Sequence, residues 1–341
     1  MERSGRKAVN VLLMLFIVAL IAACGQGGTG DAPAGGEVAP ADEATDTDAQ
    51  EEAAEPAAEE TEAAPEEEAA SEEEAAPEGE DAESEGSGDL LSEVQGRGTL
   101  LVATDSNYAP QSFKNPDDTW EGFDIDVARE IANRLGVEIE FLDISFDVVT
   151  AGSWNDRWDI NVGSMTVTPE RQESLIFTAP YYYTPAAFTV HADSTASSLE
   201  DLASLTIGVG AATTYSDYLE GGLTLVDEEI LTEPPAAEIQ VYDTDLLAIQ
   251  DLALGDGARL DAALTALPTI QNAIDEGQPI KVLGDPVYYE QLAVALDQSS
   301  SFDPQTLADE ISQIVEEMRS DGTLTELSNQ YYGVDITTKT E

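Results

Sequence analysis

The run Gly122-Phe123-Asp124-Ile125-Asp126-Val127-Ala128-Arg129-Glu130-Ile131-Ala132 begins a helix directly after a glycine. Val127, Ile131 and Leu135 lie at helical spacing, so one face of this helix is apolar. Short β-like runs stand before and after it, at 100–103 and 137–141. The two aspartates of the run resemble half of a calcium loop, but no loop of the EF-hand type follows, and the first turn of a helix explains them better. The run therefore predicts a strand–helix–strand unit.

The same alternation continues toward the end of the chain. Further strand candidates lie at 188–190, 205–209, 260–264 and 292–296, and 307–318 forms a closing amphipathic helix. Strands that alternate with helices predict an α/β fold with mainly parallel sheets. The region from 90 to 341 is long enough for two lobes.

Composition excludes several classes of protein. The chain has 341 residues, 70 acidic and 13 basic side chains, and a formal net charge of −57. This balance excludes a nucleic-acid-binding protein, because no basic surface could replace the counterions of a phosphate backbone. The single cysteine excludes a disulfide framework and a thiolate zinc site.

A glycine-containing run at 208–213 lacks the third glycine of a dinucleotide-binding fingerprint, and we expect no cofactor.

The N-terminus has the pattern of a signal peptide over residues 1–23. Three basic residues precede an apolar segment of 13 residues, from 11 to 23. As a helix it would span about 20 Å, which is shorter than the roughly 30 Å hydrocarbon core of a bilayer. Ile21-Ala22-Ala23-Cys24 resembles a bacterial lipobox, which implies that Cys24 becomes the lipid-modified first residue of the mature protein. An ordinary signal peptide with an incidental cysteine is the alternative.

The segment 24–89 is predicted to be a disordered acidic tether. From 25 to 89 the chain has 24 acidic side chains, no basic residue and no aromatic residue. It cannot bury enough apolar surface to offset the ordering of its backbone. A solvated helix is the alternative, but runs of consecutive glutamates repel one another and Pro56, Pro65 and Pro77 interrupt it. A flexible coil of this length spans about 45 Å.

Several motifs in the remaining chain resemble family 3 of the extracellular solute-binding proteins, the amino-acid-type binding proteins of ABC importers. They are the runs at 104–110, 122–132, 163–171 and 177–182, in the order found in the family. The resemblance implies the two-lobed α/β fold of type II periplasmic binding proteins, in which two hinge crossings join the lobes. We expect one lobe at 90–190 with its return at 288–341, and the other at 191–287. The crossings are expected near 190–194 and 287–291.

Arg171 is the strongest candidate for a ligand contact. A guanidinium offers a planar pair of donors that matches a carboxylate, and this pairing is strongest in a dry, closed cleft. In the family, the arginine of the Thr-Pro-Glu-Arg run, here 168–171, holds the ligand's α-carboxylate. The alternative is a surface ion pair with a neighbouring glutamate. The resemblance also implies that Ser164 and Thr166 share this carboxylate.

Thr213 and Thr214 resemble the second-lobe loop at a helix N-terminus, where free amides meet an anion. The same two residues can cap the helix, and both roles can hold together. The family usually has glycine before this pair, whereas this chain has Ala212.

Aromatic and acidic residues complete the predicted site. Tyr108 and Phe146 fall where the family sandwiches the ligand's side chain, although an aromatic at such a place is more often part of a core. Asp105 falls where some members hold a cationic side chain, and capping of the following turn is the alternative. Trp154 and Trp158 could form an aromatic wall for a quaternary ammonium. We favour a helix face packed on the first lobe instead.

One departure from the family concerns the ligand's amine. Family members usually end the second-lobe run, here 261–266, with an aspartate that accepts the α-ammonium, but this chain has Ala266. A buried ammonium without a carboxylate partner is costly, so a standard α-amino acid is in doubt. Either another acid such as Asp105 or Glu290 accepts the amine, or the ligand has no free ammonium.

The sequence therefore predicts a membrane-tethered, extracytoplasmic binding subunit of an ABC importer. It would capture a small carboxylate-bearing solute by closure of its lobes, as a monomer without enzymatic activity, and present it to permease subunits in the membrane. Cys24 would anchor it to lipid. Two alternatives stay open, namely a sensory module for a membrane receptor and a dehydratase-type enzyme in the same cleft.

Overall fold

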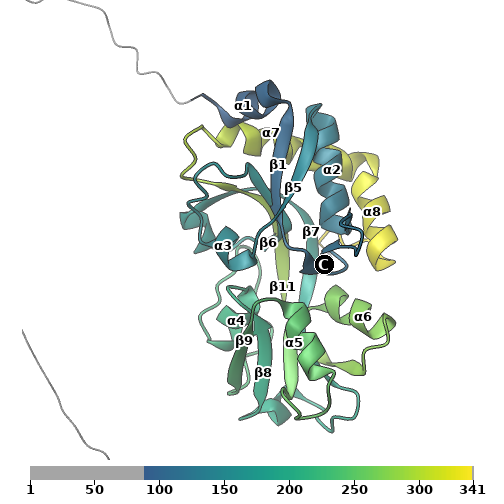
Figure 1. The fold of residues 1–341 in the computed structure, drawn as a ribbon. Coiled ribbons are helices and arrows are strands. Elements are labelled where there is room, and N and C mark those ends of the chain that lie inside the picture. The colour runs from purple at the N-terminus through teal and green to yellow at the C-terminus, as the bar shows by residue number, and fades with distance from the viewer. Residues whose placement is uncertain (1–87, 340–341) are drawn as a thin grey trace, which may run out of the picture. The chain divides into compact units, whose positions relative to one another are not determined.

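The structure, a computed structural model, describes residues 88–339 (Figure 1). The predicted signal peptide at 1–23, the lipid-modified Cys24 and all but the end of the tether at 24–89 lie outside these residues. Among residues 88–339, no helix combines the length and the apolar character needed to cross a bilayer.

The elements follow one another in two groups that are joined by two long strands. The first group is α1 Leu90–Arg97, β1 Thr99–Thr104, β2 Asn107–Tyr108, β3 Ser112–Lys114, β4 Trp120–Glu121, α2 Phe123–Leu135, β5 Glu138–Asp143, α3 Phe146–Thr150, β6 Ile160–Thr166 and the 3-10 turn η1 Arg171–Glu173. After the long strand β7 Leu175–His191 come η2 Leu199–Leu202, β8 Thr206–Gly210, α4 Thr214–Leu219, β9 Glu238–Tyr242, α5 Asp245–Leu252, β10 Ala262–Ala266 and α6 Leu267–Asp275. The second long strand, β11 Ile280–Asp297, leads back to α7 Gln305–Asp321 and α8 Thr323–Tyr332.

Eight strands form a sheet in the order β5-β1-β6-β11-β7-β10-β8-β9, and the short strands β2, β3 and β4 form another. The outer pairs β1–β5, β1–β6, β8–β9 and β8–β10 are parallel, as predicted. The centre differs, because β7 and β11 run antiparallel to each other and to their neighbours β10 and β6. The chain crosses from one lobe to the other along β7 and returns along β11, so these two strands have opposite directions.

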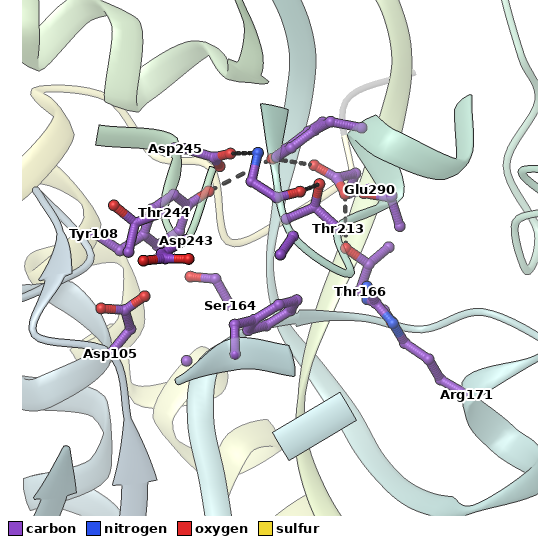
Figure 2. Close-up of a pocket in the computed structure, with 16 residues that line it drawn as sticks. Asp105, Tyr108, Ser164, Thr166, Arg171, Thr213, Asp243, Thr244, Asp245 and Glu290 are labelled. Atoms are coloured by element: carbon purple, nitrogen blue, oxygen red, sulfur yellow. Dashed lines mark hydrogen bonds between the residues drawn. The ribbon is translucent and has the colours of Figure 1, made fainter. Parts of the chain in front are cut away.

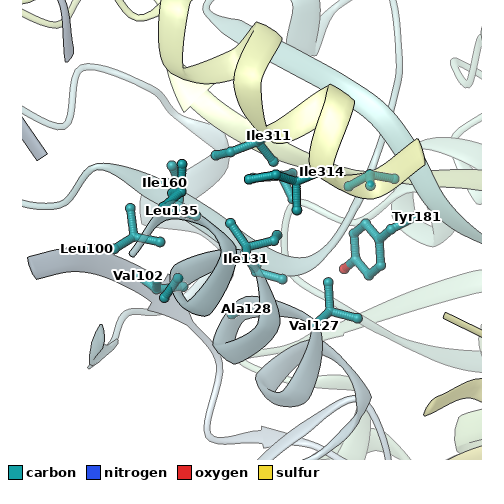
Figure 3. Close-up of a cluster of buried hydrophobic side chains, with 14 of the residues drawn as sticks. Leu100, Val102, Val127, Ala128, Ile131, Leu135, Ile160, Tyr181, Ile311 and Ile314 are labelled. Carbon is teal, nitrogen blue, oxygen red and sulfur yellow. The ribbon is translucent and has the colours of Figure 1, made fainter. Parts of the chain in front are cut away.

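The first lobe is built around α2, as the sequence predicts (Figure 3). Val127 and Ile131 of α2 pack against Leu100 and Val102 of β1 and against Ile311 of α7 in one fully buried cluster. Gly122, which stands directly before the helix, has a φ of 132°. A Cβ at this position would lie 2.2 Å from the carbonyl oxygen of Gln111, so only glycine fits here. On the opposite face of the sheet, a smaller cluster contains the two buried tryptophans of residues 154 and 158.

The second lobe has the same layered arrangement. One face of its sheet packs on α4 through a cluster that includes Phe188, Val209 and Tyr218. The other face packs on α5 and α6 through a cluster that includes Ile249 and Ile270. The predicted two-lobed α/β architecture is therefore confirmed.

The first crossing lies earlier in the chain than the predicted 190–194. Tyr182 belongs to the core of the first lobe, whereas Ala186 already packs in the second, so β7 crosses between them. The prediction placed the crossing at a strand end, but β7 continues without a break through both lobes. On β11, Tyr288 packs in the second lobe and Leu292 in the first, which agrees with the predicted 287–291.

Candidate functional site

A cavity of about 50 Å³ lies where the two lobes meet. It is lined by Asp105, Tyr108, Phe146, Gly163, Ser164, Thr166, Arg171, Gly210, Ala211, Thr213, Thr214, Tyr215, Asp243, Thr244, Asp245 and Glu290. All eight residues that the sequence assigns to ligand binding are in this set. Their positions in the chain are far apart, and the fold brings them to one place.

Three of the four carboxylates that line the cavity stand opposite its guanidinium. Figure 2 shows Asp105, Asp243 and Asp245 on one side and Arg171 on the other, with Ser164 between them. Four carboxylates therefore share the cavity with one guanidinium, if Glu290 is included. Among residues 88–339, no three His, Cys, Asp or Glu side chains have an arrangement that could hold a metal ion.

Arg171 links the two lobes across the cavity. Its side chain is almost fully buried and donates to the carbonyl oxygens of Thr166, at 3.0 Å, and Ala212, at 2.9 Å. Thr166 belongs to β6 of the first lobe and Ala212 precedes α4 of the second, so the lobes are closed on each other. The guanidinium carbon lies 5.3 Å from the ring centre of Phe146. A guanidinium has five N–H donors, so donors remain after these two bonds. The alternative, a surface ion pair with a neighbouring glutamate, is therefore excluded.

Glu290 of β11 is the most heavily bonded carboxylate of the site. Its Oε1 accepts from the hydroxyls of Thr166, at 2.7 Å, and Thr214, at 2.5 Å, and its Oε2 accepts from Tyr215, at 2.8 Å. Burial raises the pKa of Glu290, and the three hydroxyl donors and the charge of Arg171 oppose this. Because its hydrogen-bond donors come from both lobes, Glu290 stabilises the contact between the two lobes at the crossing of β11.

Ser164 lines the cavity, but its hydroxyl is engaged on the protein side. It donates to Oδ2 of Asp124 at 2.7 Å and accepts from Tyr182 at 2.6 Å. Its φ of 54° is in the left-handed region. Burial raises the pKa of Asp124 to about 6, against bonds from Ser164 and Tyr181. This network holds the unusual backbone of Ser164 in place at the cavity wall.

Thr213 caps α4, which confirms the capping interpretation. Its hydroxyl accepts from the backbone N–H of Ser216 at 3.3 Å and donates to the carbonyl of Gly210 at 2.8 Å. Ala212, which stands where the family has glycine, has a φ of 57°. Its carbonyl, as described, accepts from Arg171.

Asp245 is the main residue that the sequence analysis missed. It begins α5 and is only 7% exposed. Its Oδ1 accepts from the backbone N–H of Gly210 and its Oδ2 from the hydroxyl of Thr265, both at 2.8 Å. A Cβ on Gly210 would lie 2.6 Å from Oδ1, so only glycine allows this approach. Burial raises the pKa of Asp245 to about 7.

Two further predicted residues, Asp105 and Tyr108, line the cavity. Asp105 accepts from the backbone N–H of Asn107 at 2.7 Å, so the turn capping is present, and burial raises the pKa of Asp105. Tyr108 reaches across to Tyr215 of the second lobe, with 3.5 Å between hydroxyl oxygens. The role of both residues toward a ligand stays a prediction.

Ala266 and the two tryptophans do not line the cavity. Ala266 is fully buried in the core of the second lobe. Trp154 and Trp158 are buried in the first lobe with 5.3 Å between ring centres, so their packing prediction is confirmed. The predicted helix around them is wrong, because residues 152–158 form an irregular segment with a turn at 155–156.

Comparison with known proteins gives a consistent result. The family described as "Bacterial extracellular solute-binding proteins, family 3" matches residues 100–334. The L-cystine-binding protein TcyJ of Escherichia coli (strain K12) is 30% identical over 254 residues, which are 73% of this chain and 88% of that protein. The L-arginine-binding protein of Pseudomonas aeruginosa is 25% identical over 246 residues, which are 70% of this chain and 89% of that protein.

Solved structures agree with the sequence relatives. An ancestral arginine-binding protein bound to arginine has a TM-score of 0.60 and 28% identity, over 70% of this chain and 99% of that one. The ancestral amino acid-binding protein AncCDT-1, a precursor of cyclohexadienyl dehydratase, has a TM-score of 0.62 and 29% identity, over 72% of this chain and 100% of that one. These relatives are described as binding proteins.

Proposed function

Because the chain belongs to family 3 of the bacterial extracellular solute-binding proteins, we propose that it is the solute-binding subunit of an ABC importer and captures a small carboxylate-bearing solute, an amino acid or a related compound. The relatives named for cystine, arginine and other amino acids support this class of solute. The protein acts as a monomer, hands the solute to permease subunits, and is held at the outer face of the cell membrane by lipid on Cys24.

The buried guanidinium of Arg171 is the observation that carries the proposal. It stands at the junction of the lobes with donors to spare and with an aromatic ring beneath it. A carboxylate placed there is held by charge-assisted bonds to a buried guanidinium. Only contacts that differ between open and closed lobes can drive closure, and Arg171 provides such contacts because it bonds to both lobes.

A thermal-shift screen of the purified protein tests this proposal. The panel is the twenty L-amino acids, L-cystine, betaines and dicarboxylates. A solute at 100 times its Kd stabilises the folded state by about 2.7 kcal/mol, which gives a clear shift in Tm. We expect at least one amino acid to produce the shift and Arg171→Ala to abolish it.

Arg259→Ala is the matched control, because Arg259 is 63% exposed and pairs with Asp251 on the surface of the second lobe. It should leave the shift unchanged. A protein that no compound of the panel stabilises, or one whose binding survives Arg171→Ala, would contradict the proposal.

A further inference from the structure

The cavity lacks a carboxylate at the place where the family accepts an amine. Ala266 ends β10 and its methyl group is buried in the core. A protonated amine in a closed cleft needs a hydrogen-bonded anion, because an unpaired buried charge is costly. The acceptor must therefore come from another element, or the solute has no amine.

Asp245 stands beside the missing acceptor. Its Oδ2 accepts from the hydroxyl of Thr265, the residue before Ala266, and its Oδ1 accepts from the amide of Gly210. An ionised carboxylate has about four lone-pair sites, so two bonds leave capacity for a further donor. Both α5 and β10 thus bring this carboxylate to the cavity wall at the end of β10, and Asp245 is among the residues that line the cavity.

The surroundings of Asp245 contain negative charge but no matching cation. The charged groups that act on it are Glu290 of β11 and Asp105, which follows β1, and both raise its pKa together with burial. The tyrosines that face it, at 108, 215 and 288, all have pKa values raised well above 10 and are neutral. Among residues 88–339, no salt bridge of 4.0 Å or less joins Asp245 to a lysine, arginine or histidine. A carboxylate at this position is suited to a cation that arrives with the solute.

We propose that Asp245 accepts the protonated amine of the solute and replaces the acceptor that is absent at Ala266. This inference rests on the proposed function and narrows the solute class to compounds with both a carboxylate and a protonated amine that has N–H donors. The carboxylate then meets Arg171 of the first lobe and the amine meets Asp245 of the second. One small molecule thereby ties the lobes together at its two ends.

The inference excludes two classes of solute that the sequence left open. A quaternary ammonium such as a betaine has no N–H to donate to Oδ1 or Oδ2 of Asp245. A des-amino acid has no cation, so it leaves the buried carboxylate unpaired. Both should bind much more weakly than the corresponding amino acid.

Calorimetric titration of wild type and Asp245→Asn tests the inference. The probes are the twenty L-amino acids and L-cystine, then the des-amino and N-trimethyl counterparts of each one that binds. In the wild type, we expect removal of the amine to weaken binding by about 10- to 100-fold. In Asp245→Asn, we expect the amino acid itself to weaken by a similar factor, and the des-amino counterpart to change little.

Asp256→Asn is the matched control, since it removes one negative charge from an exposed position of the same lobe. Asparagine at 245 keeps the size of the side chain, and its oxygen can still accept from Gly210. A crystal structure of the wild type with the tightest-binding amino acid gives a second measurement that does not depend on a variant. It should place the amine nitrogen within hydrogen-bond distance of a carboxylate oxygen of Asp245.

The outcomes separate this inference from the proposed function. Amino acids that bind equally to wild type and Asp245→Asn, or an amine that contacts only Glu290 or Asp105, overturn the role of Asp245 and leave solute capture intact. Binding of des-amino acids or betaines alone, abolished by Arg171→Ala, also overturns it and leaves the carboxylate contact intact. The absence of binding by any probe refutes both.

Discussion

At the scale of single residues, the pair Gly210 and Asp245 controls the acidic side of the cavity. The amide of Gly210 holds the carboxylate, and the missing side chain of Gly210 gives it room. Any side chain at 210 must push Asp245 away from its place. This makes a small backbone residue on β8 as important for the site as the charged residue itself.

Gly210→Ala should therefore destabilise the protein by about 1–3 kcal/mol, which is typical of overpacking in a dense interior. It should also weaken binding of the solute, because Oδ1 lies 2.6 Å from the added Cβ and has to move. Chemical denaturation and titration measure the two effects.

Gly96→Ala is the control for that experiment, because no atom lies within 4 Å of the added Cβ and the residue is inside α1. It should stabilise the protein by about 0.4–1 kcal/mol. If both alanine variants behave alike, the close approach at Gly210 has no energetic consequence.

The pKa of Asp245, about 7 in the ligand-free protein, predicts a pH dependence of binding. An amine pairs with the ionised carboxylate only, so affinity should fall by about tenfold for each pH unit below 7. Titration between pH 5 and pH 8 measures this, and Asp245→Asn should remove most of the dependence. Glu290 and Asp105 lie close to Asp245 and also have raised pKa values. Any pH dependence of binding that remains in Asp245→Asn is therefore due to these two carboxyl groups.

The folding stability of the ligand-free protein should depend on pH in the opposite direction and decrease as the pH rises. Burial raises the folded-state pKa of Asp245 above its ordinary value of 3.8, so the protonated form is favoured in the folded state. The stability that this shift contributes is complete below the pKa of Asp245 in the unfolded chain, and it is lost as the pH rises through about 7. Thermal unfolding without solute should therefore show this loss, and a flat profile in the wild type would contradict the assigned pKa.

At the scale of elements, α2, β6 and β7 meet at a buried polar junction. Tyr181 of β7 donates to Oδ1 of Asp124 at 2.8 Å and accepts from the backbone N–H of Ser164 at 3.1 Å. Its hydroxyl thus satisfies a carboxylate at the start of α2 and an amide on β6. The position of Ser164 at the cavity wall depends on this junction.

Tyr181→Phe should destabilise the protein by about 1–3 kcal/mol, because it leaves a buried acceptor and a buried donor without a partner. Tyr289→Phe is the control, since Tyr289 is 37% exposed on β11. Equal denaturation midpoints for the two variants would show that the junction has no stabilising role.

The sequence predicted those elements whose apolar spacing repeats locally. The helix α2 is predicted by the helical spacing of apolar residues such as Val127, and the strand β1 by the short apolar run that contains Val102. The crossing in β7 did not follow, because β7 is one unbroken strand and its sequence pattern does not reveal on which lobe's core a residue packs.

The candidate site shows the same limit. Arg171 could be predicted because its motif and its chemistry agree. Asp245 could not, because an acidic residue in the first turn of a helix is an ordinary stabilising feature. Only burial and the approach of Gly210 and Thr265 distinguish it, and these are properties of the folded chain.

At the scale of the whole molecule, charge favours cationic solutes. Residues 90–341 contain 45 acidic and 10 basic side chains, and the cavity has four carboxylates against one guanidinium. A field of one sign attracts solutes of the opposite sign and loses strength as salt screens it.

L-Arginine should therefore bind more tightly than L-citrulline, which has the same shape but a neutral side chain. The difference should shrink as the salt concentration rises from about 0.1 M to about 1 M, because the screening length falls from about 10 Å to about 3 Å. Competitive titration at both salt concentrations measures this. Equal affinities at low salt would show that Asp105 and Asp243 do not act on the solute.

The long strand β11 has a consequence for biosynthesis. It is formed by Ile280–Asp297 but lies between β6 and β7, in the middle of the sheet that both lobes share. A ribosome adds about 5–20 residues per second, so the earlier segments emerge many seconds before this strand can join them. Neither lobe can be completed until most of the chain has been translated. The topology thus keeps the nascent polypeptide unfolded, as an extended and accessible chain, until late in translation.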